Sequence, residues 1–291
     1  MDQLEIKDQS ALRALLSQVE IPKFYQVRQC FPKDGIQDVP ACLREKLARM
    51  EIGRKIQPGM RVVLTAGSRQ IAHMPEILRE LAAYVRGQGG QPYIIPAMGS
   101  HGGATAEGQR RILESYGITE EFCGCPIYST METVQVGTTA DGAPVRMDRF
   151  AHAADAIIVV GRIKGHTAFR GPYESGLVKM IAIGLGKREG ADLLHQGGFR
   201  EFGKRLPEYA RVIWEHCNIL FGVGLIENEF DETCRMEVIP GEEIFTQEPP
   251  LLQYAKSRMP RLLFPETDIL MVHEIGKNIS GNGMDPNVTG T

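Results

Sequence analysis

The chain has 291 residues, of which 43% are hydrophobic and 24% are charged. This composition is typical of a globular protein and excludes a collagen, a disordered tail and a small disulfide scaffold. The formal net charge of -3 at pH 7 lacks the basic excess that nucleic-acid-binding proteins usually carry.

The sequence shows no signal for export or membrane insertion. No apolar run reaches the roughly 18 residues of a membrane span, and the acidic amino terminus lacks the pattern of a signal peptide. The six cysteines are scattered along the chain. We therefore expect a cytoplasmic protein with reduced thiols, which binds neither nucleic acid nor membranes.

A strand, a loop and a helix follow one another twice in the first half of the chain. After predicted short helices over residues 11–16 and 39–49, apolar residues predict a strand over 61–66 and a helix over 74–86. The same pattern returns as a strand over 92–98 and a helix over 105–116. This repetition favours parallel βαβ units.

The pattern of elements changes after this region. Short strands with turn residues between them are predicted over 126–130, 133–138 and 144–148, which indicates a small antiparallel excursion. Buried strands are predicted over 155–161, 218–226 and 268–273, with a helix over 250–258. The expected fold class is α/β, with a mostly parallel sheet of βαβ units and this small antiparallel excursion.

Polar, glycine-rich loops follow four of the predicted strands, at residues 65–69, 99–103, 161–166 and 274–278. If those strands are parallel, all four loops open at one edge of the sheet, where α/β proteins bind ligands. His101 and His166 lie in two of these loops, beside glycines that allow a ligand to approach closely. A single loop histidine is more often an ordinary surface residue, but two at one edge are candidate acid/base groups.

Three further patterns carry less information. The glycine-rich residues 184–190 lack the spacing and the preceding strand of a dinucleotide-binding loop, and Cys123 with Cys125 indicates a turn rather than a metal site. Arg69, with Ser68 and Thr65, suits a phosphate at the start of a helix, while a solvated arginine explains the pattern equally well.

The segment 161–179 resembles the core motif of the nickel-dependent lactate racemase family, whose cofactor is a nickel-pincer nucleotide. The Lys-x-His loop of that family corresponds to Lys164-Gly165-His166, and the lysine that tethers the cofactor corresponds to Lys179, 13 residues after His166. His195 follows Lys179 after 16 residues, which is the family's spacing between the tether and the nickel ligand.

Two other loops resemble the same family. Gly99-Ser100-His101 is similar to its Gly-Thr-His loop, which carries the other acid/base histidine, and Ser68-Arg69 is similar to the Thr-Arg of its phosphate-binding loop. The acidic residues that usually precede that Thr-Arg are absent, because Thr65-Ala66-Gly67 stands there. The resemblance extends over residues 60–280.

The resemblance implies a racemase or epimerase of a 2-hydroxy acid, which acts by hydride transfer to the cofactor. The cofactor would be pyridinium-3-thioamide-5-thiocarboxylic acid mononucleotide with Ni(II), supplied by cofactor-synthesis enzymes. His101 and His166 would exchange the hydroxyl proton, a role that the ordinary imidazole pKa of about 6.5 suits. Lys179 would tether the cofactor, Ser68 and Arg69 would bind it, and His195 would ligate nickel.

The resemblance also implies a domain boundary. We expect a lactate-racemase-like catalytic and cofactor domain over residues 1–265 and the beginning of a truncated second α/β domain over 266–291. The chain ends in a Gly/Asn-rich stretch typical of a loop cut short. Lys277 is a candidate contact to the phosphate or the substrate carboxylate, and Asn282 and Asp285 are weaker candidates.

Two alternatives remain open at this stage. One is a non-catalytic or cofactor-handling relative that binds a phosphorylated ligand in the same loops. The other is a metal-free phosphate- or nucleotide-binding enzyme, which would use Arg69 and residues 99–103 as an anion cradle. The 2-hydroxy acid and the oligomeric state do not follow from the sequence.

Overall fold

The computed structural model describes residues 10–20, 23–196, 198–264, 266–276 and 284–290. Its contacts divide the chain into two units, Met1–Phe31 and Pro32–Thr291. The first unit contains helix α1 (Ser10–Leu16), which confirms the helix predicted over residues 11–16. All the candidate site residues belong to the second unit, and the predicted boundary after residue 265 stays a prediction.

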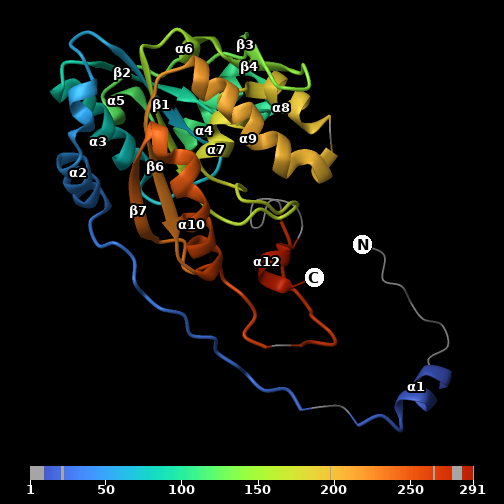
Figure 1. The fold of residues 1–291 in the computed structure, drawn as a ribbon. Coiled ribbons are helices and arrows are strands. Elements are labelled where there is room, and N and C mark those ends of the chain that lie inside the picture. The colour runs from blue at the N-terminus through green and yellow to red at the C-terminus, as the bar shows by residue number, and fades with distance from the viewer. Residues whose placement is uncertain (1–9, 21–22, 197, 265, 277–283, 291) are drawn as a thin grey trace. The chain divides into compact units, whose positions relative to one another are not determined.

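The second unit is built on a five-stranded sheet with the strand order β2-β1-β5-β6-β7. Neighbouring strands are parallel from β2 to β6, and β7 runs antiparallel to β6 (Figure 1). The predicted mostly parallel sheet is thus confirmed. Its strands are β1 (Arg61–Ala66), β2 (Gln91–Pro96), β5 (Ala156–Arg162), β6 (Ile219–Glu227) and β7 (Thr233–Pro240).

The small antiparallel excursion is also confirmed, because β3 (Thr133–Thr138) pairs with β4 (Pro144–Asp148). Two predicted strands are wrong. Residues 126–130 make one isolated bridge, between Ile127 and Ile94, instead of a strand. Residues 268–273 are irregular and exposed, because this apolar run pairs with no strand among the described residues.

Helices cover both faces of the sheet. The helices predicted over residues 39–49, 74–86 and 105–116 are confirmed as α2, α3 and α4, and the helix predicted over 250–258 begins earlier, as α10. The longer helices are α2 (Val39–Arg49), α3 (Met74–Gly87), α4 (Ala106–Ser115), α8 (Lys187–His195), α9 (Gly198–His216) and α10 (Ile244–Ser257). The short ones are α5 (Glu120–Cys123), α6 (Arg149–His152), α7 (Leu177–Lys179) and α12 (Pro286–Thr289).

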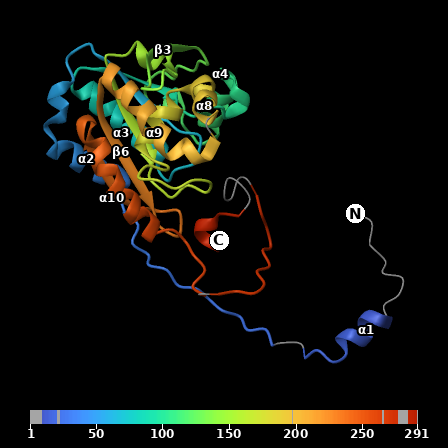
Figure 2. The same ribbon diagram turned by 45° about the vertical axis from the view of Figure 1, so that its right-hand side comes forward.

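Alternate residues of the strands enter two separate cores. Val62 and Leu64 of β1 pack with α2 and α3, whereas Val63 packs on the opposite face with α7, α9 and α10. This period of two is what a strand buried on both faces requires. Figure 2 shows the resulting three layers, with the sheet between the two groups of helices. No helix among the described residues is long and apolar enough to cross a membrane.

The strand order reverses direction between β1 and β5. β1 has β2 on one side and β5 on the other, so the loops that leave β1 and β5 diverge. In open α/β sheets, ligands bind in the crevice that such a reversal opens at the carboxyl ends of the strands. The loop after β1 carries Ser68 and Arg69, and the loop after β5 carries Lys164 and His166.

Candidate active site

Three of the four predicted loops meet at the carboxyl edge of the parallel strands. They follow β1, β2 and β5, as expected. The fourth loop does not follow a strand, because residues 268–273 form none, but its described residues 274–276 line a cavity together with Lys164. Lys277 and Asn282 lie outside the described residues, so their predicted contacts stay predictions.

The three polar residues predicted together at the end of β1 lie in different environments. Thr65 is fully buried, and its hydroxyl accepts a hydrogen bond from the Val160 amide at 2.9 Å, so the side chain joins two strands and is not available to a phosphate. Ser68 is half-buried, and its carbonyl accepts a hydrogen bond from the Tyr116 hydroxyl at 3.0 Å. Arg69 is exposed after the end of β1, so an anion can reach its guanidinium.

The loop after β2 presents His101 to solvent. Gly99, Gly102 and Gly103 all have positive φ values, which makes this tight path favourable for glycine. Nδ1 of His101 lies 2.8 Å from the Met98 carbonyl. Because a carbonyl only accepts hydrogen bonds, Nδ1 carries the proton of the neutral ring, and Nε2 carries the basic lone pair.

The loop after β5 is closed into a compact turn that holds His166. Lys164 and Ser175 exchange backbone hydrogen bonds of 3.0 and 3.2 Å at its two ends. The buried carboxylate of Glu174 accepts hydrogen bonds from the amides of His166, at 2.7 Å, and Gly171, at 3.2 Å. Glu174 is paired with Lys256 of α10 at 2.6 Å. The backbone at His166 is therefore fixed by a buried glutamate that is paired with a half-buried lysine.

His166 carries its ring proton on the opposite atom from His101. Its Nδ1 accepts a hydrogen bond from the Ala168 amide at 3.1 Å, so the neutral ring has its proton on Nε2. Burial, reinforced by the positive charges of Lys179 and Lys164, lowers the pKa of His166 from 6.5 to about 3. His166 is consequently neutral at physiological pH in this state.

Lys179 lies on α7, whose first turn is held by a buried glutamate. The Glu248 carboxylate of α10 accepts a hydrogen bond from the Val178 amide at 2.9 Å. Burial, together with the positive charges of Arg69 and Lys164, lowers the pKa of Lys179 from 10.5 to about 8. A lysine with such a pKa has a substantial fraction of free amine near neutral pH, which covalent attachment requires.

His195 is the last residue of α8 and is exposed. Its Nδ1 lies 2.6 Å from the Ala191 carbonyl, which places the proton on Nδ1 and the metal-binding lone pair on Nε2. The start of the His101 loop packs against the same helix, because a Cβ at Gly99 would lie 3.7 Å from Cβ of Ala191.

A row of aromatic rings joins three of the predicted residues. The rings of His166 and Phe169 are 4.4 Å apart, those of Phe169 and Phe202 are 4.7 Å apart, and those of Phe202 and His195 are 4.9 Å apart. The Lys179 ammonium lies 5.9 Å from the centre of the Phe169 ring. His166, Lys179 and His195 thus gather around two buried phenylalanines, although the loop, α7 and α8 are separate elements.

Positive charge is concentrated in the same place. Burial, with the charges of Arg162 and Arg69, lowers the pKa of Lys164. The Lys164 ammonium makes no ion pair with a carboxylate of the described residues. Arg69, Lys164 and Lys179 therefore form a cationic group suited to an anionic ligand. Among the described residues, no three His, Cys, Asp or Glu side chains gather closely enough to hold a metal ion by themselves.

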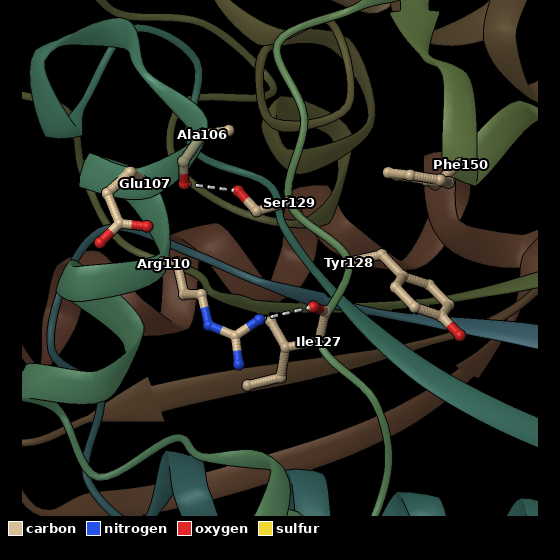
Figure 3. A pocket seen from close by; sticks show the side chains of 7 residues that line it. All are labelled: Ala106, Glu107, Arg110, Ile127, Tyr128, Ser129 and Phe150. Atoms are coloured by element: carbon tan, nitrogen blue, oxygen red, sulfur yellow. Dashed lines mark hydrogen bonds between the residues drawn. The ribbon is translucent and has the colours of Figure 1, made fainter.

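Two hollows lie near these elements. A cavity of about 390 Å³ adjoins Lys164, between the ends of β5 and β6 and the segments 255–260, 272–276 and 284–289, and Asp285 lies in its wall. Asn287 of α12 donates a hydrogen bond to the His166 carbonyl at 3.1 Å. Figure 3 shows the other hollow, of about 330 Å³, beside Arg110 and Tyr128, and no predicted site residue lines it.

The lactate racemase N-terminal domain model matches residues 8–204 of this chain, which include every candidate site residue except Lys277 and the weaker candidates Asn282 and Asp285. The chain belongs to the lactate racemase N-terminal domain family. Residues beyond 204 contribute Glu248 and Lys256, so part of the support of the site lies outside the matched region.

A solved relative shows the same fold as this family member. The lactate racemase apoprotein from Thermoanaerobacterium thermosaccharolyticum matches with a TM-score of 0.56 and 12% sequence identity. The match covers 80% of this chain and 60% of that protein, so this chain spans less than two thirds of the relative's length. No curated protein matches the sequence.

Proposed function

We propose that this chain holds a nickel-pincer nucleotide and forms the catalytic part of a racemase or epimerase of a 2-hydroxy acid. The main support is that His166, Lys179 and His195 gather along one row of aromatic rings, beside the cations Arg69 and Lys164. These residues come from separate elements, and they combine a lowered lysine pKa, an imidazole whose tautomer leaves the lone pair on Nε2, and two cations that form no ion pair with a carboxylate of the described residues. Such a combination is typical of a ligand site.

The described residues fit such a cofactor in three respects. The Lys179 amine is available for an acyl link, because its pKa is lowered to about 8. Arg69 and Lys164 suit the phosphate of a mononucleotide, and Nε2 of His195 suits Ni(II). Since the described chain offers no complete metal cage, the other nickel donors would come from the cofactor.

The two histidines have different starting states for the proton transfers. When bound, the cofactor supplies an acceptor for the C2 hydride of the substrate. Nε2 of His101 carries the lone pair that would accept the hydroxyl proton, whereas His166 bears its single ring proton on Nε2 and would donate a proton only as the imidazolium. A cation such as Lys164 would hold the carboxylate of the substrate, and the adjoining cavity has a volume typical of small-molecule sites.

The experiment that tests this proposal is expression together with the cofactor-synthesis enzymes. We expect about one nickel per chain by elemental analysis and added mass on the peptide that contains Lys179. Lys179→Met should remove the added mass, whereas Lys204→Met, on the exposed face of α9, should keep it. Finding neither nickel nor added mass in the wild-type chain under these conditions would refute the proposal.

His195 has a closely matched control. His216 also ends a helix, and its Nδ1 lies 2.8 Å from the carbonyl four residues earlier, that of Val212. We expect His195→Ala to abolish nickel retention with an unchanged circular dichroism spectrum, and His216→Ala to retain nickel. Equal nickel content in the two variants would show that His195 is not the ligand.

The cationic group also supports a second candidate function. Arg69 and Lys164 suit any phosphorylated ligand, so a non-catalytic relative would use the same residues. Loaded protein that contains nickel and the Lys179 adduct, yet racemises none of a panel of chiral 2-hydroxy acids and sugar acids, would favour this alternative.

A further inference from the structure

Lys187 is a fully buried lysine to which the proposed function gives no role. It comes eight residues after Lys179 and eight before His195, within the glycine-rich segment 184–190. Its φ is 55°, in the left-handed region that side chains other than glycine seldom adopt. A buried charge and a strained backbone at one position indicate a specific structural task.

The ammonium group of Lys187 has three partners, two that accept its hydrogen bonds and one carboxylate oxygen with which it forms an ion pair. They are the Pro96 carbonyl at 2.6 Å, Oε1 of Gln109 at 2.9 Å and Oδ2 of Asp148 at 3.2 Å. Pro96 ends β2, Gln109 lies on α4 and Asp148 ends β4. Lys187 therefore binds three elements to the start of α8.

Gln109 carries this connection into the His101 loop. Its side chain is fully buried, and its Nε2 donates hydrogen bonds to the carbonyls of Gly99, at 2.8 Å, and His101, at 3.3 Å. Because Lys187 occupies Oε1, the amide of Gln109 can only point its Nε2 towards the loop. The ammonium thus fixes the orientation of the group that holds the His101 backbone.

We propose that Lys187 is a positioning residue, which sets the His101 loop relative to α8 and thereby His101 relative to His195. Replacing a buried ion pair by packed apolar side chains often leaves stability unchanged or higher, so stability alone does not explain this arrangement. An apolar residue does not supply the two directed hydrogen bonds and the ion pair of this ammonium group. The importance of the position of His101 relative to His195 rests on the proposed function. The restraint on the His101 loop does not depend on that function.

A second ion pair, half-buried, gives an internal comparison. Lys256 pairs with Glu174, whose carboxylate holds the amides of His166 and Gly171. Each candidate acid/base loop is thus held by its own lysine, from a different helix. Removing one ammonium should loosen one loop and leave the other unchanged.

The test compares Lys187→Met, Gln109→Met and Lys256→Met in the full chain without cofactor. Hydrogen exchange reports the amides of His101 and Ala104, which are bonded to the carbonyls of Met98 and His101 at 3.2 Å each. Long-range proton–nitrogen spectra report which ring nitrogen of each histidine is protonated. We expect Lys187→Met and Gln109→Met to accelerate exchange of these amides at least about tenfold and to mix the tautomers of His101.

In the same two variants, the amide and the ring signals of His166 should not change, whereas Lys256→Met should alter His166 and leave His101 unchanged. If Lys187→Met fails to fold, Gln109→Met still tests the restraint on the His101 loop, because this variant keeps the Lys187–Asp148 pair. Unchanged exchange at His101 in Gln109→Met would overturn the proposal, as would equal acceleration at both loops. Because nickel is not involved, these results are independent of whether the proposed function holds.

Discussion

In the state described, the pKa of His166 does not suit its proposed role as an acid/base group. An acid/base group works best when its pKa lies near the operating pH, and the pKa of His166 is lowered to about 3 by burial and by Lys179 and Lys164. An acyl link to the Lys179 amine would leave that nitrogen uncharged and remove one of these causes. Attachment of the cofactor would then also prepare His166 for proton transfer.

Lys179→Met reproduces this loss of charge without any cofactor. We expect the pKa of His166 to rise above about 3 in this variant, because a neutral thioether no longer opposes the imidazolium. Proton–nitrogen spectra recorded from pH 8 downwards measure it, with Lys204→Met as the control for a distant charge. A pKa of His166 that is equal in both variants would mean that burial alone sets it.

The sequence identifies the residues that would contact the ligand. It does not identify the residues that position those side chains. His101, His166, Lys179 and His195 follow motifs with a fixed spacing, so they were accessible from the sequence. Their supports were not, because a glutamate such as Glu174 or Glu248 looks in the sequence like any solvated carboxylate. Its burial depends on elements that lie more than 60 residues away.

At the scale of elements, α10 supports both halves of the site. Glu248 holds the first turn of α7, which carries Lys179, and Lys256 reaches the His166 loop through Glu174. A single helix thus fixes the tether and one histidine relative to each other. Because α10 lies beyond residues 8–204, the matched domain by itself lacks this support.

Glu248 should make stability depend on pH in a predictable direction. Burial raises its pKa from 4.5 to about 7, so between these values the folded protein keeps a proton that the unfolded chain releases. The stability contributed by this group therefore falls as the pH rises through that window. Glu248→Gln does not ionise, so its midpoint of thermal unfolding, relative to wild type, should be higher at pH 8 than at pH 5. A difference that is independent of pH would contradict the assignment.

The turn between α7 and α8 is closely packed. Residues Met180–Gly184 form a π-helical turn, a form that is often found at functional sites. A Cβ at Gly184 would lie 2.9 Å from the Ala97 carbonyl, closer than the backbone tolerates. We expect Gly184→Ala to lower the free energy of unfolding by about 1–3 kcal/mol in urea titrations. Gly87→Ala, where nothing lies within 4 Å, should be neutral or slightly stabilising.

At the scale of the whole molecule, the sequence predicted the parallel strands but missed β7 and α9. In β7 every third residue is buried rather than every second. Its sequence therefore lacks the alternation of apolar and polar residues that predicts a strand. Helix α9 contains Pro207, which ordinarily indicates a break. Conversely, the apolar residues 268–273 have the composition of a strand but no neighbour to pair with among the described residues, and composition carries no information about partners.

Ligand binding should stabilise the whole chain. A ligand that binds only the folded state, at about 100 times its dissociation constant, adds about 2.7 kcal/mol to the free energy of unfolding. Nicotinic acid mononucleotide is a suitable probe, because it is a pyridinium mononucleotide like the proposed cofactor. We expect it to raise the midpoint of thermal unfolding, and we expect added salt to reduce this rise. Arg69→Ala should weaken it, whereas Arg54→Ala, which removes an exposed pair with Glu51, should not. If the nucleotide raised the midpoint equally in both variants, Arg69 would not bind its phosphate.

Because β1, β2, β5 and β6 are parallel, their carboxyl ends lie at one edge of the sheet and their amino ends at the other. The described candidate residues lie near the carboxyl edge, whereas the turns that enter β1 and β2, near Gln57 and Gly89, lie at the opposite edge. Gln57 is exposed there. A cysteine introduced at this position would therefore carry a dye or a surface linker while the crevice faces the solution, so single molecules could be watched as they take up their cofactor.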